Sequence, residues 1–155
     1  MSDMPTAPAT TGKGLLKDEA GSVTAELALL MPVISMLLFG TIYFGIALTN
    51  YQQLTFGVLT GARSFAMARG SATPYSAAVS AAQTAAPNLT PASIALVFTV
   101  NGTSCASDSA CSTALSTATG LPAKLAGTYP CNLVVPFATT VTTCTLSTAS
   151  SLIVE

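Results

Sequence analysis

The residues able to do chemistry are few and widely spaced in this chain. Only 7% of its 155 residues are charged, five basic and six acidic, and histidine is absent. Without histidine, Ser-His-Asp and Cys-His catalysis are excluded, and a metal site would need cysteine or carboxylate ligands alone. The net charge of −1 leaves no basic surface for nucleic acid. We therefore expect no enzyme, no cofactor and no nucleic-acid partner.

Glu26 directly precedes a long apolar run, Leu27 to Leu48, which contains no charged residue. At about 1.5 Å per residue, a helix of that length spans roughly 33 Å, close to the ~30 Å hydrocarbon core of a bilayer. The run is too long for a cleaved secretory signal, whose apolar region has about 7–15 residues. A carboxylate at membrane depth is costly unless it is paired, so Glu26 is a candidate functional residue. The alternative interpretation is an acidic residue favoured by the helix dipole.

The orientation of this span follows from the residues on either side of it. Lys13 and Lys17 precede it closely, whereas Arg63 and Arg69 follow at a greater distance, which favours a cytoplasmic N-terminus. All four cysteines lie beyond the span, and paired cysteines belong in an oxidising compartment. We expect a single-pass membrane protein with its C-terminal part exported.

The residues around the start of the span resemble a processing site. Gly21, four uncharged residues, Glu26 and an apolar helix are similar to the cleavage site of type IV prepilins. The longer stretch from 21 to 45 resembles the TadE-like pseudopilins of the Tad (tight adherence) pilus system, which also carry an early proline, here Pro32. The last residues, Thr145 to Glu155, are similar to the strand with a terminal acidic residue that often closes such chains.

The resemblance implies a minor pilin or pseudopilin in the bacterial cytoplasmic membrane, taken into or beneath an adherence pilus. Its partners would be a prepilin peptidase, other Tad pilins and pseudopilins, and the pilus assembly platform. Cleavage after Gly21 would free the α-amino group of Ser22, which is mostly protonated at neutral pH. That amine, in the same or the next subunit, is the expected partner of Glu26, and an intermolecular pair would fix the axial register. Residues 22–155 carry three acidic and three basic side chains, so a neutral subunit can pack against its copies.

Pro32 lies inside the expected membrane helix. Because it lacks an N–H and clashes with the carbonyl of Ala28, it predicts a kink or a short melted turn, which membrane helices tolerate. Pro32 either helps extraction or packing in a filament, or is simply tolerated.

The chain divides into four expected segments: a cleaved leader (1–21), a transmembrane helix (22–48), an amphipathic continuation of that helix (49–70) and an exported head (71–155). In the continuation, apolar residues such as Leu54, Val58 and Phe65 recur at helical spacing. Gly57 and Gly61 form a small-xxx-small pair that permits close helix approach. That pair serves either packing onto the chain's own sheet or a contact between subunits.

The sequence of the head predicts a small α+β domain. Residues 75–86 are rich in alanine and favour a second helix, while 104–125 read as a loop. Three segments rich in β-branched residues predict antiparallel strands: 94–100, closed by Asn101-Gly102, then 133–141 and 144–154. The fold class expected is α+β, with a long N-terminal helix and a small antiparallel sheet, as in pilins.

Four cysteines allow three disulfide pairings. We favour Cys105–Cys111, which closes a short loop, and Cys131–Cys144, which ties two strands near the C-terminus. A four-cysteine metal site is disfavoured because no CxxC spacing is present.

A second function class stays open beside the pseudopilin. The chain could be a membrane-tethered binding module or adhesin in which the helix is only an anchor. The two differ at Glu26, which a simple anchor does not need.

Overall fold

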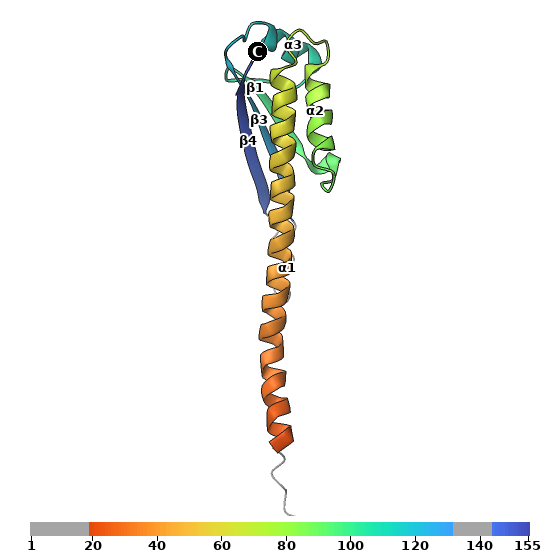
Figure 1. Cartoon of the computed structure of the whole chain (residues 1–155), viewed down its shortest axis with the longest axis vertical. Coiled ribbons are helices and arrows are strands. Elements are labelled where there is room, and N and C mark those ends of the chain that lie inside the picture. The colour runs from red at the N-terminus through yellow and green to blue at the C-terminus, as the bar shows by residue number, and fades with distance from the viewer. Residues whose placement is uncertain (1–18, 132–143) are drawn as a thin grey trace, which may run out of the picture. The chain divides into compact units, whose positions relative to one another are not determined.

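The computed structural model describes residues 19–131 and 144–155, with side chains from residue 23 onward. It begins with one long helix, α1 (Glu19–Ala66), which contains both the expected membrane span and its continuation (Figure 1). The helix ends four residues before the predicted boundary at Gly70, whose positive φ of 79° suits glycine in the turn that follows.

Two further helices belong to the head. Helix α2 (Pro74–Thr84) begins with a proline, which is tolerated at the first helical position because its missing N–H has no intrahelical partner there. A short 3₁₀ turn, η1 (Pro91–Ser93), leads into the sheet, and α3 (Asp108–Ser116) follows the first hairpin. The side chain of Ser107 caps α3 by accepting a hydrogen bond from the Ala110 amide.

Within the described residues the sheet has four antiparallel strands in the order β2-β1-β3-β4, which confirms the α+β class. The β1–β2 hairpin turns at Asn101-Gly102, where both residues have positive φ, as the sequence indicates. Strands β3 and β4 pair along nine positions, from Pro122 opposite Ile153 to Pro130 opposite Thr145. The strands are β1 (Ala95–Val100), β2 (Thr103–Cys105), β3 (Pro122–Pro130) and β4 (Thr145–Ile153).

The C-terminal part of α1 supplies the centre of the head's core. Leu54, Val58 and Phe65 are fully buried, and Leu54 and Val58 lie against Gly127 of β3. The Phe65 ring packs against Phe98 of β1 in a tilted arrangement with ring centroids 4.8 Å apart, and Tyr75 of α2 meets the same ring edge-on at 5.0 Å. The C-terminal part of α1 is therefore part of the folded head.

Two expectations about the head are corrected. Residues 104–125, predicted as a loop, contain α3, most of β2 and the start of β3. The sheet has four described strands rather than three, because β3 lies between β1 and β4. The third strand predicted from sequence, 133–141, lies outside the described residues.

Both disulfides lie in the head and pair the cysteines as the sequence favoured. Cys105 at the end of β2 is bonded to Cys111 of α3, with Cα atoms 5.2 Å apart. Cys131, directly after β3, is bonded to Cys144, directly before β4, with Cα atoms 5.0 Å apart. The described chain has no free cysteine.

Candidate processing and assembly site

The candidate site lies in the first turns of α1. The helix begins at Glu19, so the backbone of Gly21 and Ser22 is helical, and not extended, in the described conformation. Ser22 and Glu26 are four residues apart and therefore share one helix face, about 6 Å apart along the axis. The helix thus places the α-amino group that cleavage would create one turn from the Glu26 side chain.

Glu26 has no ion pair with any residue whose side chain the structure describes, and its side chain is exposed. Its nearest sequence neighbours are apolar or hydroxyl-bearing, since the first basic residue after it is Arg63. In a bilayer an unpaired carboxylate at this depth would cost several kcal/mol. A cation partner for Glu26, if it has one, lies outside the described side chains.

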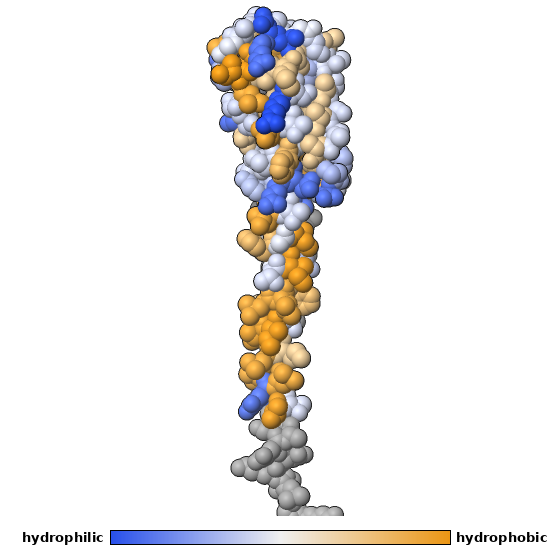
Figure 2. Space-filling view, in the orientation of Figure 1, coloured by the Kyte–Doolittle hydropathy of each residue, from blue (hydrophilic) through white to orange (hydrophobic). Residues whose placement is uncertain are grey.

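The helix surface after Glu26 is apolar and unburied by the protein. α1 is long and apolar enough to cross a membrane, and within the stretch tested no part of the most apolar window is buried. Figure 2 shows the hydrophobic side chains gathered along this helix, while the head surface is mixed and paler. The exposed large side chains before the head include Leu29, Leu37, Phe39, Ile42 and Phe44.

Hydroxyl side chains within the apolar stretch bond to the helix's own carbonyls. Ser35 Oγ donates to the Met31 carbonyl at 2.8 Å, and Thr49 Oγ1 donates to the Gly45 carbonyl at 2.9 Å. In hydrocarbon each unsatisfied polar group is costly, so these bonds let the hydroxyls enter the bilayer. These bonds satisfy the two hydroxyl groups within α1 itself, so no partner helix is needed to accept them.

α1 continues through Pro32 without a break. The short melted turn that was one of the two expected results of this proline is not formed. The Ala28 carbonyl still loses its donor, since proline has no N–H. Pro32 therefore removes one backbone hydrogen bond from a helix that stays continuous.

The glycine pair of α1 packs within the chain. A Cβ on Gly57 would lie 2.8 Å from the Ala82 carbonyl oxygen of α2, and a Cβ on Gly61 would lie 2.9 Å from both the Ala82 Cβ and a Leu125 methyl. This resolves the alternatives left open by the sequence in favour of packing inside the head. Gly57 and Gly61 are thus not available as a seam between subunits.

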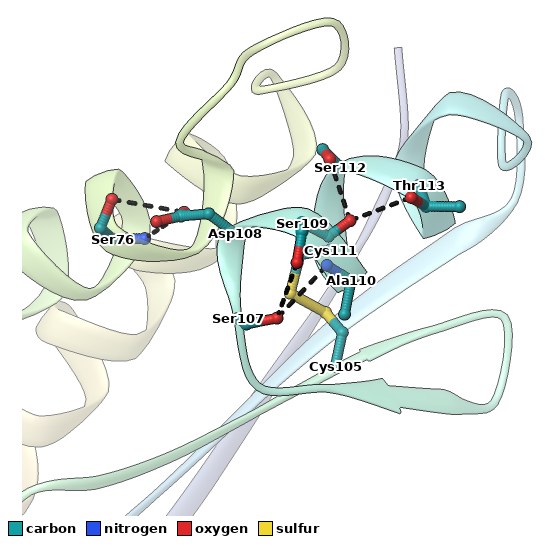
Figure 3. Close-up of a disulfide and its surroundings, with 9 residues drawn as sticks. All are labelled: Ser76, Cys105, Ser107, Asp108, Ser109, Ala110, Cys111, Ser112 and Thr113. Atoms are coloured by element: carbon teal, nitrogen blue, oxygen red, sulfur yellow. Dashed lines mark hydrogen bonds between the residues drawn. A yellow bond between two sulfur atoms is a disulfide. The ribbon is translucent and has the colours of Figure 1, made fainter.

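The described head offers no catalytic arrangement. Among the side chains the structure describes, no group of three or more His, Cys, Asp or Glu could hold a metal, and no polar or charged residue is fully buried. Asp108 bonds Ser76 at the start of α2, a structural contact beside the Cys105–Cys111 disulfide (Figure 3).

Taken together, a membrane-spanning apolar helix, a small α+β head and two disulfides define a membrane-anchored structural protein. More particularly, residues 21–63 match the family model described as TadE-like protein. The matched stretch begins at Gly21 and covers most of α1, whereas the strands lie outside it. No curated protein and no solved structure matches the chain.

The sequence missed residues that shape the site's surroundings rather than the site itself. Gly127 of β3 was not singled out, yet α1 packs so closely there that an added Cβ would collide with a Val58 methyl. Asp108 was counted only as a charge, whereas it holds α2 to α3. The alternation of buried Ala123, Leu125 and Gly127 is the signal that could have revealed β3.

Proposed function

We propose that this protein is a minor pilin or pseudopilin that a prepilin peptidase cuts after Gly21 and that takes part in assembly of a Tad-type pilus for adherence. The observation that carries the proposal is the family match beginning at Gly21, joined to an exposed Glu26 without a described ion-pair partner. After cleavage, the Ser22 amine and the Glu26 carboxylate are the complementary pair that brings each subunit into register with the next.

The first turn of α1 is suited to the peptidase. Its N–H groups have no intrahelical acceptors, so this turn opens at low cost. Glycine destabilises a helix by about 1 kcal/mol relative to alanine and carries no Cβ, so the backbone at Gly21 can unwind and lie extended in a cleft. The helical conformation described for Gly21 is then the resting state before recognition.

The proposed topology puts residues 1–21 in the cytoplasm and the head on the far side of the cytoplasmic membrane. The two disulfides support an exported head, because the cytoplasm keeps thiols reduced. The partners we propose are the prepilin peptidase, other Tad pilins and pseudopilins, and the assembly platform. Incorporation into a surface pilus follows if the cut subunit is extracted.

Intact mass measurement tests the cleavage. The full chain is produced in a host with and without an active prepilin peptidase, and purified from the membrane. We expect the loss of residues 1–21 and a new N-terminus at Ser22 only with the peptidase. Gly21→Val should block the cut, while Gly40→Val, deeper in the same helix, should be processed normally. A chain that keeps its first residues despite active peptidase, or is cut inside the apolar run, overturns the proposal.

A further inference from the structure

Strand β4 forms one edge of the sheet, and no described strand pairs with its outer side. The Val154 amide donates to the Leu121 carbonyl and the Cys131 amide donates to the Cys144 carbonyl, so even-numbered residues of this strand turn their backbone toward β3. Because backbone groups alternate in direction along an antiparallel strand, the odd-numbered residues face the open edge. Those residues are Thr145, Ser147, Ala149, Ser151 and Ile153.

Strand β4 itself carries none of the features that usually protect an edge. Charged side chains, proline, bulges or a very short strand prevent edges from pairing with other chains. β4 has nine residues, TLSTASSLI, without charge or proline, and pairs with β3 in unbroken register. Within the described residues, its outward backbone groups are therefore left for another strand.

The sequence of β4 is chemically symmetrical about Ala149. If a second copy of β4 lies antiparallel with Ala149 opposite Ala149, Ser147 meets Ser151 and Leu146 meets Leu152. Thr148 meets Ser150, and the β-branched Thr145 and Ile153 meet at the ends. In this register odd residues face odd residues, so the outward backbone groups of both strands point at each other as a ladder requires. A two-fold contact needs this kind of self-complementarity.

A groove beside the edge provides room for the facing leucine. Arg63, Ala66 and Met67 at the end of α1 and Leu152 and Ile153 of β4 line a depression of about 640 Å³, which Ser151 and Glu155 also border. Met67 and Ile153 are each about two-thirds exposed. The register above places Leu146 of a second copy beside Leu152 on this apolar wall. The apolar groove and the outward backbone groups of β4 thus both favour a second copy of β4 as the occupant.

The direction of β4 determines which copies can meet. Val58 of α1 lies against Gly127, which pairs with Thr148, while Ala66 lies beside Leu152, so β4 and α1 run the same way through the head (Figure 1). An antiparallel β4 pair therefore makes the two α1 helices run in opposite directions. Two heads whose α1 segments run in the same direction cannot pair in this way, whereas two heads that face each other can.

We propose that β4 is a homophilic contact edge, which joins the heads of two copies of this chain held on opposing surfaces. The contact is an eight-stranded sheet continuous across a two-fold axis at Ala149, with Leu146 of each copy against Leu152 of the other. It uses the head alone, and it does not depend on cleavage after Gly21 or on pilus assembly. The two proposals can fail separately.

Cysteine cross-linking of the full chain in detergent tests the register. Because all four native cysteines are paired, a single new thiol is specific. Residues opposite each other in a hydrogen-bonded pair have Cα atoms about 5.5 Å apart, within disulfide range. Under mild oxidation we expect Ala149→Cys to give a disulfide-linked dimer.

Ser147→Cys provides the matched control. Its own copies would lie about 14 Å apart along the strand and should stay monomeric, while a mixture of Ser147→Cys and Ser151→Cys chains should cross-link. If Ala149→Cys stays monomeric, or if Ser147→Cys alone links equally well, the proposed contact is overturned.

Vesicle tethering tests the opposed arrangement. Full chains reconstituted into phosphatidylcholine vesicles should bring vesicles together, as measured by light scattering. Ala149→Pro removes an outward N–H that β3 does not use, so the head should fold but tethering should be lost. Ala149→Ser keeps that donor and should tether like the native chain. Tethering by Ala149→Pro at the native level, or dispersed vesicles with the native chain, counts against the proposal.

Discussion

The Asp108 carboxylate belongs to α3 but caps α2: its Oδ1 accepts hydrogen bonds from the Ser76 amide at 2.9 Å and from the Ser76 hydroxyl at 3.3 Å (Figure 3). Thr73, the residue at the α2 N-cap, makes no side-chain cap bond. An acidic group from a distant part of the sequence thus replaces the local cap and ties the two helices together. The same α3 is held to β2 by the Cys105–Cys111 disulfide.

Asp108→Ala should destabilise the head by about 1 kcal/mol, the usual cost of losing a helix cap. Asp108→Asn keeps an oxygen acceptor at the same position and should lose less. Denaturant unfolding followed by tyrosine fluorescence measures the effect, since Tyr75 lies in α2 against Phe98. Equal midpoints for the native chain and the alanine variant would show that the cap contributes nothing.

Loss of the Cys105–Cys111 bond should also lower the stability of the head. The bond closes a short loop between residues six apart, for which the chain-entropy model gives about 2–3 kcal/mol. The double variant Cys105→Ala, Cys111→Ala should unfold at a lower denaturant concentration than the native chain. Reduced and oxidised samples of that variant differ only at Cys131–Cys144, which separates the two contributions. An unchanged midpoint would contradict the prediction.

Gly127→Ala should destabilise the head by about 1–3 kcal/mol, the range for overpacking a core. The new Cβ would overlap a Val58 methyl and lie 3.4 Å from methyls of Leu54 and Leu96. The double variant with Val58→Ala removes the overlapping methyl, so the two changes together should cost less than their sum. Gly40→Ala, where a Cβ meets nothing in the described protein, should leave head unfolding unaltered.

Glu26→Gln separates the proposed pseudopilin from a simple tethered adhesin. The variant should still insert into the membrane, since it removes a charge from an apolar helix, and should still be cut after Gly21. It should fail to enter a pilus, because the Ser22 amine then has no carboxylate to pair with. Glu26→Asp retains the charge and should retain part of the assembly. Normal pilus production by the glutamine variant would favour the anchor interpretation.

Much of the architecture can be predicted from local pattern. The apolar run from Leu27, the stripe of Leu54, Val58 and Phe65, and the Asn101-Gly102 turn each carry a signal within a few residues. The structure has the corresponding helix, core face and hairpin. These elements are predictable because burial and turn geometry there depend on neighbours in sequence.

β3 and α3 were not predicted because their composition reflects contacts made far along the chain. On the buried face of β3 the small residues Ala123 and Gly127 stand where a strand usually has β-branched ones, and α1 packs closely against the sheet at Gly127. α3 is rich in serine and threonine, which are weak helix formers, and a cap and a disulfide stabilise it.

The candidate site, too, could be predicted from the sequence only in part. The spacing of Gly21 and Glu26 is visible in the sequence, and the structure adds that one helix carries both. The proposed cation partner of Glu26 is the Ser22 amine, which exists only after cleavage, so the structure of the uncut chain does not contain it.

The last turns of α1 are the centre of the head's core, where Leu54, Val58 and Phe65 are buried. A force that pulls this part of the helix along its own axis would act on the contacts of all three side chains at the same time, in shear. Contacts loaded in parallel resist a pull better than contacts that open one after another. The head is therefore built to resist a pull along the part of α1 that it contains.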